Sequence, residues 1–193
     1  MRTHLHREVT PARRRLLRAA TVLALAAALL SFGATAVASA CKHAGKRPSQ
    51  LTLKEARHAI RCLVNKKRHR AGLRRLRGNS LLREAAQAHS TAMDSYDFFS
   101  HYSPDGGSPS SRVGGSGYAA GASRWNVGEN IGWGSGGSGT PRAAVRGWMG
   151  SGVHRGVILT RGFRHIGVGF VPGSPDGAPS DSGIYTVDFG YRK

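Results

Sequence analysis

Apolar side chains recur at helical spacing early in the chain. Ile60 and Val64 follow the run Thr52-Leu53-Lys54-Glu55, in which a threonine and a glutamate three residues apart form a capping box. A helix is therefore predicted from residue 53 until Gly72 stops it. The basic run Lys66–Arg70 is expected to be the solvated end of this helix, where cations suit the helix dipole.

A second helix is predicted to begin near Asn79-Ser80. Its inner face carries apolar and small side chains at helical spacing, namely Leu82, Ala85, Ala86, His89, Ala92, Met93 and Tyr96. A single histidine on such a face, here His89, is more often a hydrogen-bonded core residue than a ligand. Two further helices are expected to begin at Ser108-Pro109 and at Thr140-Pro141, because proline suits the first helical position.

The last third of the chain alternates apolar and other residues, which is typical of strands. His165–Val171 and Gly183–Tyr191 are predicted to pair, joined by a polar loop over 173–182. Asp188 falls on the face away from the aromatic side chains, and we expect it to pair with an arginine or to cap a loop. Residues 114–124 and 132–139 indicate loops. Helices followed by a strand pair predict an α+β layered domain.

Residues 1–40 have the three parts of a secretory signal peptide. Six arginines and one glutamate in residues 1–18 precede the apolar run Leu23–Leu30, and Ala38-Ser39-Ala40 forms an A-x-A cleavage site. A membrane anchor is the alternative, for which this apolar run is short. Arg13-Arg14 fits a twin-arginine export signal and equally an ordinary basic region. We expect a secreted protein, extracellular or associated with the cell wall, without a transmembrane helix after processing.

Charge is strongly one-sided, with 29 lysines and arginines against 10 acidic residues and a net charge of +19. Removing residues 1–40 leaves about +14, because that segment carries five net positive charges. A basic lead-in over 41–52 would then precede a domain over 53–193. Such a surface is expected to adhere to anionic partners, namely cell-wall polymers, lipid head groups or nucleic acid, and charge alone does not choose among them. No specific nucleic-acid recognition is expected, and a monomer is the expected oligomeric state.

Two cysteines, Cys41 and Cys62, remain outside the predicted signal peptide. An even pair in an exported protein favours a disulfide, which would attach the new N-terminus to the first helix. The alternative is a lipoprotein modified at Cys41, although Ala38-Ser39-Ala40 lacks the leucine of a good lipidation signal and that interpretation leaves Cys62 unexplained.

Glu129 is the most informative residue of the chain. It is one of few acids, and it lies in the apolar, glycine-rich run Asn126–Trp133. A carboxylate in such surroundings needs a partner, or its pKa shifts and it becomes neutral. Local spacing supplies no partner, because the chain has no H-E-x-x-H, C-x-x-C or G-x-S-x-G motif.

The run from Leu63 to Tyr191 resembles the CAP superfamily (SCP or pathogenesis-related-1-like), in its short secreted bacterial branch. Eight short segments carry the resemblance in order: Cys62–Asn65 with Ala71–Leu73, Ala88–Ser90 with Met93, Phe99–His101 with Ser103–Gly106, Gly128–Ile131, Ala144-Val145 with Trp148-Met149, His154-Arg155 with Ile158-Leu159, His165–Gly169, and Asp188–Gly190. The resemblance implies a three-layer α-β-α sandwich.

The resemblance also implies a cleft built from two histidines and two glutamates. His101, Glu129 and His154 match three members, whereas Ser151 stands where the second acid would lie. Two imidazoles and a carboxylate are acceptable ligands for Zn²⁺ or another divalent cation. The alternative is a hydrogen-bonded network that fixes loops without metal.

Two function classes follow. The first is a non-enzymatic binding module for a cell-wall, lipid or other extracellular ligand. The second is a metal-dependent extracellular hydrolase that uses His101, Glu129 and His154. A serine hydrolase built on Ser151 and His154 has weaker support, since no third orienting residue is evident. The missing second acid favours the binding module.

Overall fold

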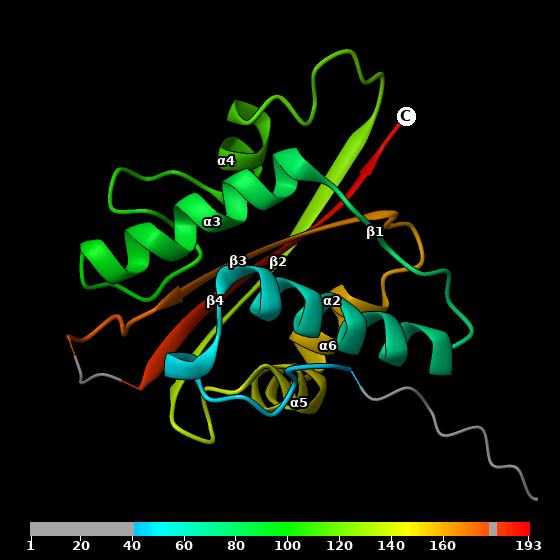
Figure 1. Ribbon diagram of the computed structural model, residues 1–193. Helices are drawn as coiled ribbons and strands as arrows, with labels where there is room; N and C mark the ends of the chain where they lie inside the picture. The colour runs from blue at the N-terminus through cyan, green and yellow to red at the C-terminus, as the bar shows by residue number, and fades with distance from the viewer. Residues whose placement is uncertain (1–40, 178–180) are drawn as a thin grey trace, which may run out of the picture. The chain divides into compact units, whose positions relative to one another are not determined.

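The structure is a computed structural model that describes residues 41–177 and 181–193. The predicted signal peptide, residues 1–40, lies outside the described residues. Residues 41–193 form one compact unit. Its elements in chain order are η2 (Pro48–Gln50), α2 (Leu53–Arg70), β1 (Arg77–Gly78), α3 (Ser80–Ser95), α4 (Pro109–Gly115), β2 (Trp125–Ser135), α5 (Pro141–Gly150), α6 (Gly152–Leu159), β3 (His165–Pro172) and β4 (Ser182–Arg192) (Figure 1).

The four strands form one sheet in the order β1-β3-β4-β2. β1 pairs with β3 in parallel, and the other neighbours are antiparallel. Figure 1 shows α3 and α4 on one side of the sheet and α2, α5 and α6 on the other. The molecule is therefore a three-layer α-β-α sandwich, as predicted.

The layers are held by two different kinds of contact. On the α2 side, Ile60, Val168 and Phe189 belong to one large apolar core. On the α3 side, a Cβ at Gly167 or Gly169 would overlap the backbone of Leu82 or Ala86. Glycine at these two positions is therefore what lets α3 lie directly on β3.

Helix starts agree with the predicted caps. Thr52 and Glu55 form the expected capping box at α2, and the side chains of Asn79 and Thr140 cap α3 and α5. Each cap satisfies a backbone N–H that the first helical turn leaves without an internal partner. These starts were predictable because the interactions are local.

The glycine-rich segment after Trp125 differs from the prediction. The sequence indicated a loop over 132–139, yet β2 continues to Ser135 and pairs with β4 along its whole length. Because β4 supplies a partner for each residue, weak strand propensity in the glycines is overridden. The predicted strand pair is thus part of a four-stranded sheet.

The basic end of α2 also differs from the prediction at one residue. Arg68 is fully buried, although the run Lys66–Arg70 was expected to be solvated. Its guanidinium donates hydrogen bonds to the backbone oxygens of Arg74, Ile158 and Thr160. Arg68 therefore joins the end of α2 to the end of α6, and only its neighbours form a solvated end.

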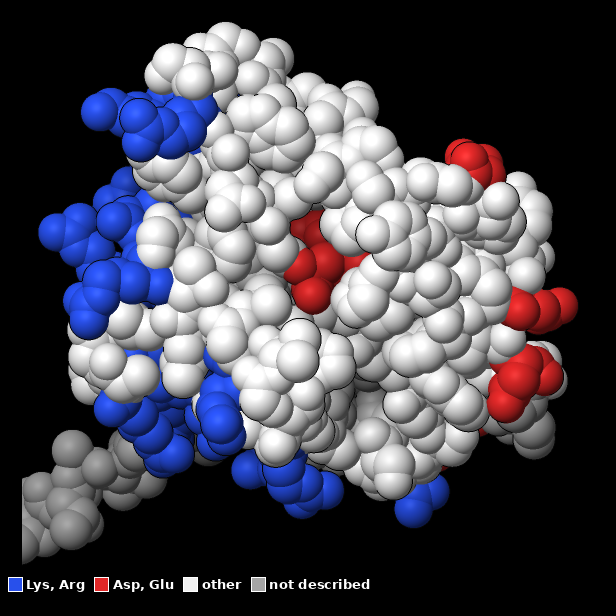
Figure 2. All heavy atoms as spheres, turned by 180° about the vertical axis from the view of Figure 1, so that it is seen from behind, with Lys and Arg blue, Asp and Glu red and all other residues white. Residues whose placement is uncertain are grey.

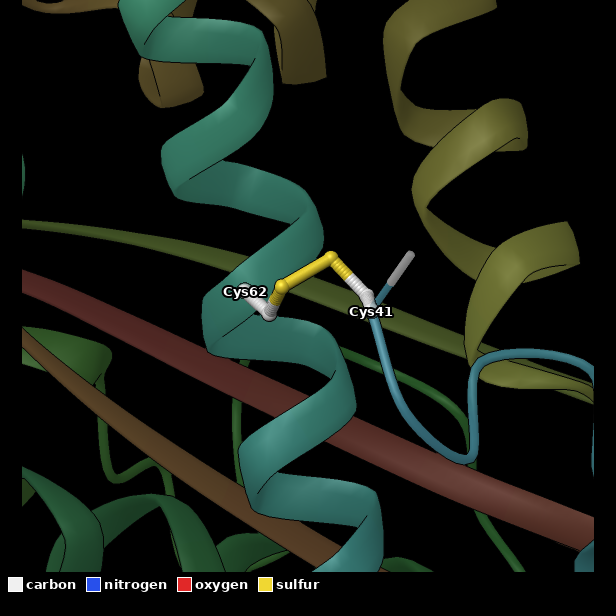
Figure 3. Close-up of a disulfide and its surroundings, with 2 residues drawn as sticks. All are labelled: Cys41 and Cys62. Atoms are coloured by element: carbon white, nitrogen blue, oxygen red, sulfur yellow. A yellow bond between two sulfur atoms is a disulfide. The ribbon is translucent and has the colours of Figure 1, made fainter. Parts of the chain in front are cut away.

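A disulfide joins Cys41 to Cys62, with Cα atoms 5.7 Å apart. Figure 3 shows that it ties the segment before η2 to the middle of α2. The predicted pairing is confirmed, and the Cys41 sulfur is engaged in it. Within the described residues, no helix is both long and apolar enough to cross a bilayer.

Candidate functional site

Glu129 lies in the middle of β2, and its side chain is almost wholly buried. Both carboxylate oxygens are engaged. His101 Nδ1 donates to Oε1 at 2.7 Å, and Arg112 Nη2 donates to Oε2 at 2.7 Å. The partner that the sequence left open is therefore a histidine and an arginine together.

Arg112 is placed by the short helix α4. The Ser108 side chain caps that helix and accepts from the Ser111 backbone. The Arg112 guanidinium also donates to the backbone oxygens of His101 and Gly107. One buried cation thus holds the carboxylate of β2 and the loop that carries His101, which fixes the geometry of the pair.

Asp188 is the cross-strand neighbour of Glu129 in the β2–β4 ladder. Asp188 was expected to pair with an arginine or to cap a loop, and it does neither among the described residues. Asp188 is 1% exposed and makes no salt bridge within the described residues, and the Glu129 carboxyl group acts to raise its pKa. Two carboxyl groups directly opposite each other on one face of a sheet are stable only when they share a proton.

The two carboxyl groups have opposite pKa shifts. Burial raises the pKa of Asp188 well above its ordinary value, and the charge of Glu129 raises it further. Burial also acts to raise the pKa of Glu129, but the hydrogen bond from His101 and the charge of Arg112 outweigh it and leave that pKa lowered. These opposite shifts favour the state of the pair in which Glu129 is ionised and Asp188 carries the proton.

His89 reaches the same network from α3. It is buried, and its Nε2 donates to the Ser100 backbone oxygen at 2.9 Å. Burial is the main cause of its lowered pKa, so the ring is neutral. Its Nδ1 and the Nε of Arg112 have no hydrogen-bond partner among the described residues. The prediction of a hydrogen-bonded core histidine is confirmed.

A cavity of about 530 Å³ lies between α3 and the segment 103–112. His89 and Arg112 form part of its wall, so the buried network borders this cavity. Ala92, Tyr96 and Pro104 give the cavity apolar surface. Figure 2, which views the molecule from behind, shows acidic atoms recessed in a hollow near the centre of that face.

His154 and Ser151 are placed differently from His101. Ser151 caps α6, and its Oγ accepts from the His154 backbone N–H at 3.5 Å. The His154 backbone oxygen accepts from the Asn130 side chain. Burial, followed by the charge of His101, lowers the pKa of His154. No hydrogen bond joins the Ser151 side chain to the His154 side chain in the described chain, so a catalytic serine–histidine pair is not formed.

The Arg112 contact bears on the three-ligand metal site predicted from the resemblance. Within residues 41–177 and 181–193, no group of three His, Cys, Asp or Glu side chains is placed to hold a metal ion. The chemistry of the donors explains this, because the Arg112 guanidinium binds one oxygen of Glu129 and would repel a divalent cation there. Zinc binding by His101, Glu129 and His154 stays a prediction.

Arg112 is the site residue that the sequence reasoning missed. It is the only charged residue between Asp105 and Arg124. Arg112, which lies in a stretch of glycine, serine and alanine, resembles Glu129 in being a charged residue without a partner nearby in the sequence. Pairing the two isolated charges would have found the contact.

Comparison with known proteins shows a family match that covers most of the described chain. The family model described as "CAP: Cysteine-rich secretory protein family" matches residues 62–189. The chain is 38% identical over 109 residues to the uncharacterized protein YkwD of Bacillus subtilis, an alignment that covers 56% of this chain and 40% of that protein.

Two solved structures are similar as well. An extracellular protein of Bacillus anthracis that contains an SCP domain matches with a TM-score of 0.57 at 28% identity, covering 71% of this chain and 40% of that one. An outer surface protein of Borrelia burgdorferi matches with a TM-score of 0.61 at 18% identity, covering 74% and 97%. The second likeness shows the fold alone. This chain spans about 40% of the length of each of the two Bacillus proteins.

Proposed function

Because this chain belongs to the CAP family of cysteine-rich secretory proteins, we propose that it is a secreted, non-enzymatic binding module for an extracellular ligand. The ligand is a component of the cell wall, a lipid or another extracellular molecule. It is held in the cavity lined by His89 and Arg112 and attracted by the basic surface.

One observation carries the proposal, namely that both oxygens of Glu129 are already bound. A general base must reach the proton that it removes, and its pKa must lie near the working pH. The Glu129 side chain is 1% exposed, each of its oxygens already accepts a hydrogen bond, and its pKa is lowered, which weakens it as a base. The carboxylate is therefore suited to organising the wall of a binding cavity.

The cavity itself supports binding of a small ligand or of one unit of a polymer. Its volume of about 530 Å³ lies within the range of small-molecule sites. Apolar surface from Ala92 and Tyr96 is combined with polar side chains, among them Ser111 and Arg112, that line the same cavity.

Secretion is supported by three features. Residues 1–40 have the pattern of a signal peptide. The disulfide between Cys41 and Cys62 is typical of an oxidising compartment. The Bacillus anthracis protein is described as extracellular and the Borrelia protein as an outer surface protein.

The proposal is tested by sedimenting the purified mature protein with isolated cell wall and with anionic vesicles at increasing salt. Ala92→Leu fills the cavity, and Thr91→Leu adds an apolar side chain at the neighbouring exposed position outside it. We expect Ala92→Leu alone to weaken binding, by about tenfold. Equal binding by the two variants would exclude the cavity as the ligand site.

The alternative hydrolase is tested in the same samples. We expect no soluble product to be released from wall material over the incubation. Release of product that is lost in His101→Ala would contradict the proposal and support the metal-dependent hydrolase.

A further inference from the structure

A second concave site lies on another part of the molecule, at the outer edge of the sheet. It is a groove of about 880 Å³, and Ile166–Val168 of β3 form its floor. α2 and the first turn of α3 form its walls, together with Lys42 and His43. In Figure 1 these two helices pass on either side of β3, next to β1.

The edge of β3 in this groove is closed to another strand. β1 covers it only at His165 and Ile166. Farther along, Arg57 Nε donates to the Val168 backbone oxygen at 3.2 Å, and the Gln87 amide group bonds both the N–H and the oxygen of Phe170. Side chains of the protein therefore already form hydrogen bonds with the backbone groups of β3 that another strand would need in order to pair with it.

The charge of the groove is almost entirely positive. Five lysines and arginines line it, against the single carboxylate of Glu55. That carboxylate is already held by Lys46 at 2.9 Å and His43 at 3.1 Å. Lys54 and Arg61 have no salt bridge within the described chain, and the only one of Arg83 there, to the exposed Glu84, is 3.9 Å long. The groove therefore holds cations that lack close carboxylate partners.

The start of α3 adds to this field. α3 has 16 residues and no acidic residue in its first turn. Its N-cap Asn79 and its first residue Ser80 line the groove. The N-terminal end of a helix carries partial positive charge. Burial, followed by the positive charge of Arg83, lowers the pKa of Arg57. The guanidinium groups of Arg57 and Arg83 therefore repel each other. An anion in the groove would relieve that repulsion.

We propose that this groove binds a linear phosphate polymer, with Lys54, Arg61 and Arg83 contacting successive phosphates and the N-terminus of α3 contacting one more. The inference rests on the proposed function and names where an anionic partner is held. A volume of about 880 Å³ suits several linked units better than a single ion. Guanidinium groups match phosphate in a bidentate geometry.

The concave shape decides between a polymer and a membrane. A flexible chain enters a groove and meets cations on both walls. A flat lipid surface touches only the rim, and it meets protruding cations elsewhere on the molecule equally well. We therefore assign the groove to a chain, and a lipid surface becomes an outcome of the test.

The test measures the affinity of the mature protein for inorganic polyphosphate by fluorescence anisotropy at several salt concentrations. One variant combines Lys54→Gln, Arg61→Gln and Arg83→Gln in the groove. Its control combines Lys67→Gln, Arg70→Gln and Arg74→Gln, which removes the same charge at positions that do not line the groove.

We expect the groove variant to bind polyphosphate at least about tenfold more weakly than wild type. The slope of log K against log salt concentration should also decrease in magnitude by about 2 to 3, because each lost phosphate contact reduces that slope by roughly 0.7 to 0.9. The control should change the affinity less than about threefold. Equal weakening in both variants would show diffuse attraction by net charge and overturn the proposal.

A second pair of variants separates binding from folding. Ser80→Glu places an acid in the first turn of α3 inside the groove, where it stabilises the helix and repels phosphate. Ser110→Glu makes the same change in the first turn of α4, outside the groove. We expect only Ser80→Glu to weaken polyphosphate binding, by about threefold or more, with an unchanged or higher melting temperature. Unweakened binding in Ser80→Glu would contradict the proposal.

Vesicles with anionic lipid complete the test. We expect the two triple variants to bind them equally. Selective loss of vesicle binding in the groove variant, with polyphosphate binding retained, would assign the groove to a lipid surface instead. The Ala92→Leu cavity variant should bind polyphosphate normally, so failure here and failure of the proposed cavity function are distinguishable.

Discussion

The centre around Glu129 and the groove over β3 use charge in opposite ways. At the centre, Glu129 and Asp188 are buried, and the largely buried guanidinium of Arg112 binds the Glu129 carboxylate. In the groove, cations such as Lys54 and Arg61 are exposed and lack carboxylate partners among the described residues. Buried charge must be matched inside the protein, whereas exposed charge remains available to a partner.

The same contrast appears across the surface. Figure 2 shows lysines and arginines gathered along one side of the face, while acidic atoms lie on the other side and in the central hollow. The proposed cavity and the proposed polymer groove are therefore different kinds of site. The first is fixed in geometry, and the second is set mainly by charge.

The largest expected effect is a difference in stability between an arginine substitution at the centre and one in the groove. Arg112→Ala leaves the Glu129 carboxylate buried beside Asp188 without its cation, and we expect it to lower the free energy of unfolding by roughly 3–5 kcal/mol. Arg83→Gln in the groove should change it by less than about 0.5 kcal/mol. Urea unfolding measures both. Similar values for the two variants would break the comparison.

Loss of the disulfide is expected to lower the free energy of unfolding by about 3 kcal/mol. This bond closes a loop with a sequence separation of 21 residues, and loops of this size contribute about that much in the chain-entropy model. The Cys41→Ser/Cys62→Ser variant should also bind polyphosphate more weakly, since the disulfide holds Lys42 and His43 at the groove. Wild type in reductant is the control, and it should match the variant.

Titration of the centre is expected to change the free energy of unfolding with a defined sign. The raised pKa of Asp188 means that the folded state binds a proton that the unfolded state has released above its ordinary pKa. This carboxyl therefore costs stability increasingly as pH rises toward the folded pKa, at up to about 1.4 kcal/mol per pH unit. Asp188→Asn should remove that cost.

Urea unfolding of wild type and Asp188→Asn from pH 4 to pH 8 measures the difference. The advantage of the variant should grow with pH across this window, because the amide needs no proton to donate to Glu129. Glu129 has the opposite sign, since its lowered pKa gives stability that is lost as pH falls. An advantage that shrinks with rising pH would contradict the shared-proton assignment.

The smallest expected effect concerns zinc. Arg112 occupies the second oxygen of Glu129, so we expect the heat of zinc titration to be the same in wild type and in His101→Ala. Isothermal titration of the chelator-treated protein measures it. Tight one-to-one binding that His101→Ala removes would restore the metal site of His101, Glu129 and His154, and with it the hydrolase.

Local interactions explain what the sequence predicted well. The caps at Thr52, Asn79 and Thr140 and the apolar faces of α2 and α3 depend on neighbours within a few residues. The disulfide followed from an even cysteine count in an exported chain. The resemblance to the CAP family then supplied the layers and the candidate residues His101, Glu129 and His154.

Only the tertiary structure decided the partners of Glu129. Strand periodicity says which face a residue is on, but pairing of β2 with β4 sets Glu129 opposite Asp188. A helix start at Ser108 then brings Arg112 to the same carboxylate. These contacts join segments far apart in the chain, and burial of each charge was possible only because the fold brought all three together.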